Sequence, residues 1–206
     1  MLIKTSTLNI LVLLCENLSR MKNTFLTIVT IFSLAVNAQE KLPYHQIPEA
    51  ADKYTAGSVV ARTIDGLGFR YYWATEGLTD NDLIYKPSDE ARTTSETIDH
   101  ILGLSEVILN AMLKKENGEA LPDMTFAEKR KRTLENLEKA SRIAKETNNI
   151  AQHKMIFGKT EFPFWNVING PISDAIWHVG QIVSFRRSSG NPLPKGVNVL
   201  RGTKSE

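Results

Sequence analysis

Asp174 and His178 are the two residues whose types and spacing are best suited to chemistry. They stand four residues apart in a segment, residues 169–192, that is predicted to form one helix. Side chains at this spacing lie one turn apart on the same helix face, where they can share one ion. His100 interrupts an apolar stretch upstream. Two imidazoles and one carboxylate, contributed by two helices, would form a metal site with three protein ligands.

The same three residues also have a purely structural interpretation. A carboxylate is not buried without a partner, and Asp174 could simply accept a hydrogen bond from His178. His100 would then be a core histidine that makes its own hydrogen bond. Any helix can hold an aspartate and a histidine at this spacing, so the spacing alone leaves both interpretations open.

Four long segments with apolar residues at helical spacing must position these side chains, and they predict an all-α fold, a four-helix bundle. Thr93 and Thr125 each begin a capping box with a glutamate three residues later. Pro171 suits the first position of the last helix, and Gly190 the position just past its end. The helices are expected at about residues 49–76, 93–115, 125–147 and 171–189.

The connections between these helices differ in character. A single helical turn is expected from Thr79. The long connection before the last helix, residues 148–169, is rich in aromatic side chains, and we expect it to pack over one end of the bundle. His153, within it, is expected at the surface. No segment alternates apolar and polar residues convincingly, so no strand is predicted.

Residues 21–38 have the layout of a secretory signal peptide. Lys22 supplies the positive charge, residues 25–36 form an apolar core, and Ala38 is a small residue at the cleavage position. The core is too short to span a hydrocarbon layer of about 30 Å comfortably. We therefore expect an exported protein, periplasmic or secreted, with no stable membrane insertion once the leader is cleaved.

The chain accordingly divides into three parts. Met21 is a second candidate start of translation, which would make the residues before it an extension of the leader. The expected parts are a leader at residues 1–38, a helical bundle at residues 39–192 and a tail at residues 193–206.

Composition narrows the classes of partner. The chain has 25 basic and 23 acidic residues, and the leader holds three of the former and one of the latter, so the mature charge balances. A balanced charge argues against a nucleic-acid partner. The single cysteine, Cys15, lies in the leader, which leaves no thiolate ligand and no disulfide in the mature domain. The oligomeric state stays open, with a homodimer as one alternative.

The histidine of the second helix and the last-helix motif Asp174-x-x-x-His178-x-Gly180-Gln181-Ile182 resemble the DinB-like, YfiT-like four-helix-bundle family. In that family the last helix typically carries His-x-x-x-His-x-Gly-Gln, and the second helix carries a third histidine. Asp174 departs from the pattern, although mycothiol-dependent relatives carry a carboxylate at this position. The resemblance covers roughly residues 49–192.

The resemblance implies a divalent metal ion held by His100, Asp174 and His178. Zn²⁺, Ni²⁺, Mn²⁺ and Fe²⁺ all suit such a ligand set. Gln181 lies one turn beyond His178 and is the best candidate to orient it in a cofactor site. The implied activity is a metal-dependent transferase or hydrolase that acts on an unidentified small molecule. The alternative is a non-catalytic helical binding or interaction protein with a structural Asp–His pair.

Overall fold

The structure is a computed structural model that describes residues 41–205, and it is mostly helical. The predicted leader lies outside the described residues. Four helices are long: α2 (Ala56–Thr75), α4 (Thr94–Leu113), α5 (Phe126–Glu146) and α7 (Ser173–Ser188). The shorter helical elements are α3 (Asp80–Ile84), η1 (Ile150–Gln152), α6 (Phe164–Val167) and the π-helical segment η2 (Ile168–Ile172). No helix in the described range is both long enough and apolar enough to cross a membrane.

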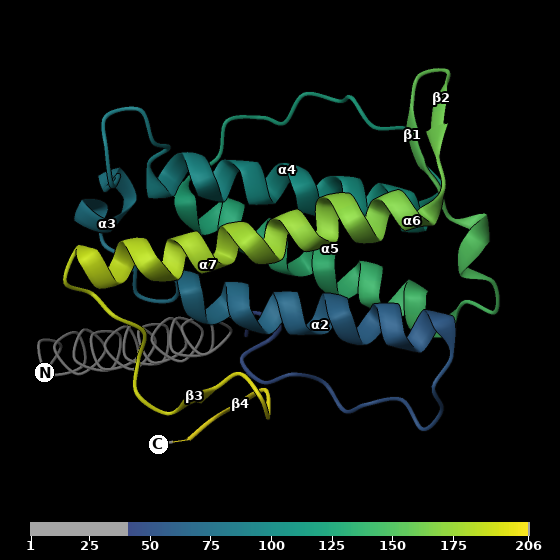
Figure 1. The fold of residues 1–206 in the computed structure, drawn as a ribbon, viewed down its shortest axis with the longest axis horizontal. Coiled ribbons are helices and arrows are strands. Elements are labelled where there is room, and N and C mark those ends of the chain that lie inside the picture. Colours follow the sequence, from purple (N-terminus) through teal and green to yellow (C-terminus); the bar gives the residue numbers. More distant parts are fainter. Residues whose placement is uncertain (1–40, 206) are drawn as a thin grey trace, which may run out of the picture. The chain divides into compact units, whose positions relative to one another are not determined.

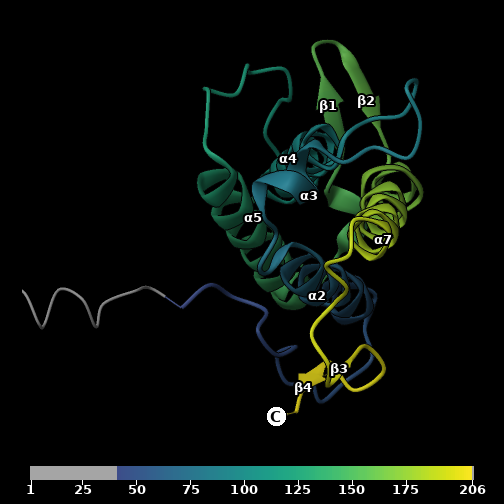
Figure 2. The same ribbon diagram turned by 90° about the vertical axis from the view of Figure 1, so that its left-hand side faces the viewer.

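The four long helices pack around one apolar core (Figures 1 and 2). Helix α5 packs against α2 and α4, and α7 packs against the same two helices. In the end-on view the helices follow one another as α5, α4, α7 and α2 (Figure 2). Helices α4 and α5 run in the same direction, because the chain between them returns along the length of α4 (Figure 1). The core includes Ile64, Leu67, Ile101, Ile108, Leu134, Leu137, Val179 and Ile182.

Helix α2 begins later than the apolar pattern predicted. It starts at Ala56, because Thr55 caps it. The Ser58 amide donates to Thr55 Oγ1 at 3.0 Å, and the Thr55 amide donates to Ser58 Oγ at 2.8 Å. This is a reciprocal capping box with serine in the place of the usual glutamate. The predicted start near residue 49 was wrong because apolar spacing continues upstream of the cap.

The last helix also begins elsewhere than predicted. It starts at Phe164, and Pro171 lies inside it rather than at its first position. A proline inside an α-helix lacks the amide donor and its ring clashes with the carbonyl four residues before it. The chain adopts a π turn there, in which the Ser173 amide reaches Ile168 O, five residues back. The Ser173 hydroxyl donates to the same oxygen at 2.7 Å.

Two short antiparallel hairpins were not predicted. Strands β1 (Met155–Phe157) and β2 (Thr160–Phe162) pair within the aromatic connection, and β3 (Val197–Asn198) pairs with β4 (Thr203–Lys204). Strands of two or three residues are too short to show an alternating pattern. The predicted tail is therefore ordered by the pairing of β3 with β4. A backbone hydrogen bond, from the Ile47 amide to Gly202 O at 2.8 Å, also joins it to the segment before α2.

A buried arginine joins α7 to α2. Arg186 is 2% exposed, and its Nη1 donates to the backbone oxygens of Trp73, Ala74 and Glu76 at 3.0–3.1 Å. The last carbonyls of a helix have no partner within that helix. Arg186 supplies one, together with the positive charge that a helix C-terminus favours. The end of α7 is thereby held against the end of α2.

Asp82 completes this junction. Helix α3 forms at the turn expected from Thr79, which caps it. Asp82 accepts hydrogen bonds from Ser189 and Asn191 as well as from the Thr79 amide. Burial opposes ionisation of Asp82, but these hydrogen bonds outweigh it and hold the pKa of the carboxyl well below its usual value.

Asp65 is a second buried carboxyl, and its surroundings act in the opposite sense. The Tyr44 hydroxyl donates to Asp65 Oδ1 at 3.0 Å, and the Tyr44 ring lies so close to Gly68 that any side chain there would collide with it. Asp65 is 8% exposed. Burial raises the pKa of Asp65, although hydrogen bonds from Ser141 and Tyr44 oppose the rise.

Asp65→Asn should therefore stabilise the protein at neutral and alkaline pH. The folded pKa of Asp65 exceeds the unfolded one, so the stability of the wild type falls as pH rises above the ordinary value of 3.8. Asparagine keeps an acceptor for Tyr44 and does not ionise. The melting temperature of the variant should exceed that of the wild type by a margin that grows as pH rises above about 4 and levels off once Asp65 is ionised in the folded protein, with about 2–4 °C for each kcal/mol. Asp52→Asn, at an exposed position, is the control. A margin independent of pH would contradict this assignment.

Candidate metal centre

Two adjacent helices present the three residues singled out in the sequence. His100 lies in the second turn of α4, and Asp174 and His178 lie on the first two turns of α7. The start of α4 is set by Thr93, whose capping box with Glu96 has both hydrogen bonds in place. Helices α4 and α7 pack against each other, so the residues of the two helices come together.

The ligand atoms of the three side chains converge. One atom from each of His100, Asp174 and His178 lies within 4.8 Å of the other two. His100 Nε2 is 3.1 Å from Asp174 Oδ2, and His178 Nε2 is 3.3 Å from Asp174 Oδ1. The two imidazole rings are perpendicular, with centroids 4.6 Å apart. Atoms that share one ion at about 2.0–2.2 Å lie about 3–3.5 Å apart, so small movements would bring all three onto a common ion.

Gln181 lies on the far side of the His178 ring. Its Oε1 is 2.7 Å from His178 Nδ1. An amide oxygen only accepts hydrogen bonds, so this contact places a proton on Nδ1 and, in the neutral ring, a lone pair on Nε2. That lone pair faces the Asp174 carboxylate. Two acceptors that face each other repel, unless a cation stands between them or the ring carries a second proton.

The cluster is reachable from solvent. The side chains of His100, Asp174 and His178 are 33%, 35% and 14% exposed. A structural metal site is closed by four protein ligands, whereas a catalytic site keeps a coordination position open. Three partly exposed ligands match the second arrangement.

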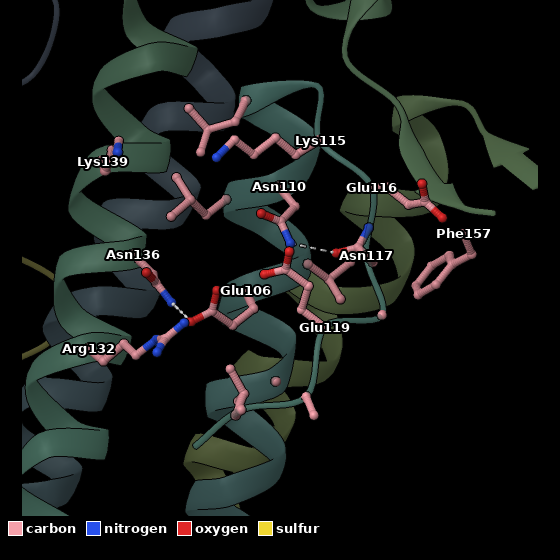
Figure 3. Close-up of a pocket in the computed structure, with 17 residues that line it drawn as sticks. Glu106, Asn110, Lys115, Glu116, Asn117, Glu119, Arg132, Asn136, Lys139 and Phe157 are labelled. Carbon is pink, nitrogen blue, oxygen red and sulfur yellow. Dashed lines mark hydrogen bonds and ion pairs between the residues drawn. The ribbon is translucent and has the colours of Figure 1, made fainter. Parts of the chain in front are cut away.

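A separate cavity of about 550 Å³ lies between α4 and α5, beneath residues 115–121 (Figure 3). Two of its charged side chains form an ion pair. Arg132 Nε is 2.5 Å from Glu106 Oε1, and the Asn136 amide donates to the same oxygen at 2.8 Å. None of the three candidate ligands lines this cavity.

His153 is not part of the cluster and was misplaced by the sequence interpretation. It is buried, 3% exposed, and its Nε2 lies 3.2 Å from Thr147 Oγ1. Burial lowers the pKa of His153, while the backbone oxygens of Ala111 and Met112 oppose this. The prediction of a surface position was wrong because the connection packs inward, with Phe164 beside the imidazole.

Comparisons with known proteins give no assignment. No family model matches the chain, and no curated protein or solved structure matches it significantly. The functional argument therefore rests on the residues and their geometry.

Gln181→Leu should weaken metal binding while leaving the fold intact. Leucine occupies a similar volume but cannot accept the Nδ1 proton, so the His178 ring would lose its orientation and part of its basicity. Loss of such a partner typically weakens metal affinity about 10- to 100-fold. Competition with a chromophoric chelator measures the affinity, and Ser184→Ala, at an exposed position of the same helix, is the control. Equal affinities for both variants would show that Gln181 does not act on the ligand.

Proposed function

We propose that this chain is a DinB-like four-helix bundle that binds a divalent metal ion through His100, Asp174 and His178. The observation that carries the proposal is the convergence of these three side chains from two helices to within 4.8 Å. The hydrogen bond between Gln181 and His178 supports it, because it leaves the Nε2 lone pair directed at the cluster.

The ligand set determines what the ion could do. Two imidazoles and one carboxylate suit Zn²⁺, Ni²⁺, Mn²⁺ and Fe²⁺. When bound, such an ion activates a water by lowering its pKa to about 7, or holds a thiol as its thiolate. Asp174 would lower the charge of the site by one, and Gln181 would hold the His178 ring in its metal-binding orientation.

We further propose that the protein is exported and acts as a metal-dependent hydrolase or transferase on a small molecule. Partial exposure of all three ligands leaves room for a substrate. The signal-like leader favours hydrolysis, since reduced thiol cofactors are mainly cytosolic.

A non-catalytic bundle is the second candidate, and the same contacts support it. The distances of 3.1 and 3.3 Å are within reach of hydrogen bonds from both histidines to Asp174. This arrangement needs a proton on each Nε2, and therefore a doubly protonated His178 ring while Gln181 Oε1 faces its Nδ1. The two candidates differ in whether a metal ion or a proton supplies the positive charge.

Variants at Asp174 separate the two candidates. Asp174→Ala should lose bound metal at neutral pH, whereas Asp174→His should keep it because imidazole is also a ligand for these ions. Both variants should stay folded. Metal stoichiometry and melting temperature are measured on the same samples after loading with Zn²⁺. Asp99→Ala, which removes the neighbouring carboxylate on α4 that pairs with Lys129, should leave the stoichiometry unchanged.

A structural pair would give a different pattern. Both Asp174 variants would then lose about 1–3 kcal/mol of stability, from a buried donor left unpaired. Neither would change metal content. Equal metal in the wild type and in Asp174→Ala would reject Asp174 as a required ligand.

A further inference from the structure

Trp177 stands beside the candidate metal centre with most of its surface in solvent. It is 72% exposed, although it lies in the middle of α7. Leaving a large apolar side chain in water forgoes the free energy that burial would supply. Its one ring contact among the described residues is with His178. Among the described residues, the ring partner of the indole is therefore a candidate metal ligand.

The indole ring is aligned with the His178 imidazole. The two ring planes differ by 15°, and their centroids are 6.4 Å apart. Residues 177 and 178 point about 100° apart on an ideal helix, yet their rings lie side by side. His178 directs Nε2 towards Asp174. The indole therefore lies next to a candidate ligand, with its plane nearly parallel to the plane of that ligand's ring.

Open space adjoins the chain one turn before Asp174. A Cβ built on Gly103 or on Gly170 would meet no heavy atom within 4 Å. Gly170 precedes Asp174 by four residues and so lies about one turn from this ligand. The space beside Gly103 belongs to the separate cavity between α4 and α5. A glycine inside a helix destabilises it by about 0.5–1 kcal/mol relative to alanine. Packing does not require either glycine, and at Gly170 this leaves free space one turn before Asp174.

From these observations we infer that Trp177 is a stacking wall that selects substrates carrying a flat aromatic group next to their metal-binding atoms. This inference rests on the proposed metal site. Aromatic rings attract one another when stacked with an offset or edge to face. A ligand atom on the ion and a ring against the indole would fix a substrate at two points, which orients it for reaction.

Two hydroxamates that differ only in their side group test the inference. Benzohydroxamate and acetohydroxamate bind a metal through the same two oxygens, but only the first carries a ring. Their dissociation constants are measured on the cobalt-loaded protein from the change in its visible absorption. The wild type should prefer benzohydroxamate, and the part of this preference that Trp177→Ala removes should be about 2- to 10-fold.

Trp165 provides the matched control. It is 78% exposed, lies in α6 and makes no ring contact with His100 or His178. Trp165→Ala should keep the wild-type preference, and Trp177→Phe should keep most of it because phenylalanine also stacks. Cobalt stoichiometry should be the same in all four proteins.

The outcomes separate the two proposals. If cobalt binds and both hydroxamates bind, but Trp177→Ala keeps the full preference for benzohydroxamate, the stacking role is rejected and the metal site stands. If the wild type binds both hydroxamates equally well, the stacking role is likewise rejected and the metal site stands. If the wild type binds no stoichiometric cobalt, both the metal site and the stacking role are rejected.

Discussion

Each contact between Asp174 and the two imidazole nitrogens needs a proton or a metal ion between its atoms, and α4 and α7 are placed so that either can be supplied. Asp174 presents one oxygen to His100 and the other to His178. Gln181 Oε1 lies against the second nitrogen of His178. A divalent ion would satisfy these contacts with neutral imidazoles, and protons would satisfy them with an imidazolium at His178. In both cases Gln181 Oε1 accepts a hydrogen bond from Nδ1 of His178.

The positions of α4 and α7 are set by contacts at the ends of these helices. The capping box at Thr93 sets where α4 begins, and thus which way His100 faces. The π turn around Pro171 sets the rotation of α7, because it adds a residue to the turn directly before Asp174. At the other end of α7, Arg186 binds the last carbonyls of α2. The rotation of α7 is therefore set at one end by the π turn, and its position at the other end is set by Arg186, in addition to apolar packing.

Much of this arrangement could be predicted from the sequence, and the failures have physical causes. The capping boxes at Thr93 and Thr125 predicted two helix starts correctly. They could be recognised because all the residues that accept hydrogen bonds from the free backbone amides lie in one short segment of sequence. The shared face of Asp174 and His178 followed from helical spacing, whereas the convergence of His100 on them was expected from the family resemblance. The π turn did not, because a proline near a helix start is equally consistent with a first-turn position. The burial of Arg186 depends on α2, more than a hundred residues away in sequence, which no local pattern reveals.

The central claim is that one ion is shared by His100, Asp174 and His178. Anomalous diffraction at the zinc edge, from crystals of zinc-loaded protein, tests it most directly. The account predicts a single strong peak at about 2.0–2.2 Å from Nε2 of both histidines and from a carboxylate oxygen of Asp174. A peak elsewhere, or none at this cluster while both histidines remain hydrogen-bonded to Asp174, would contradict it.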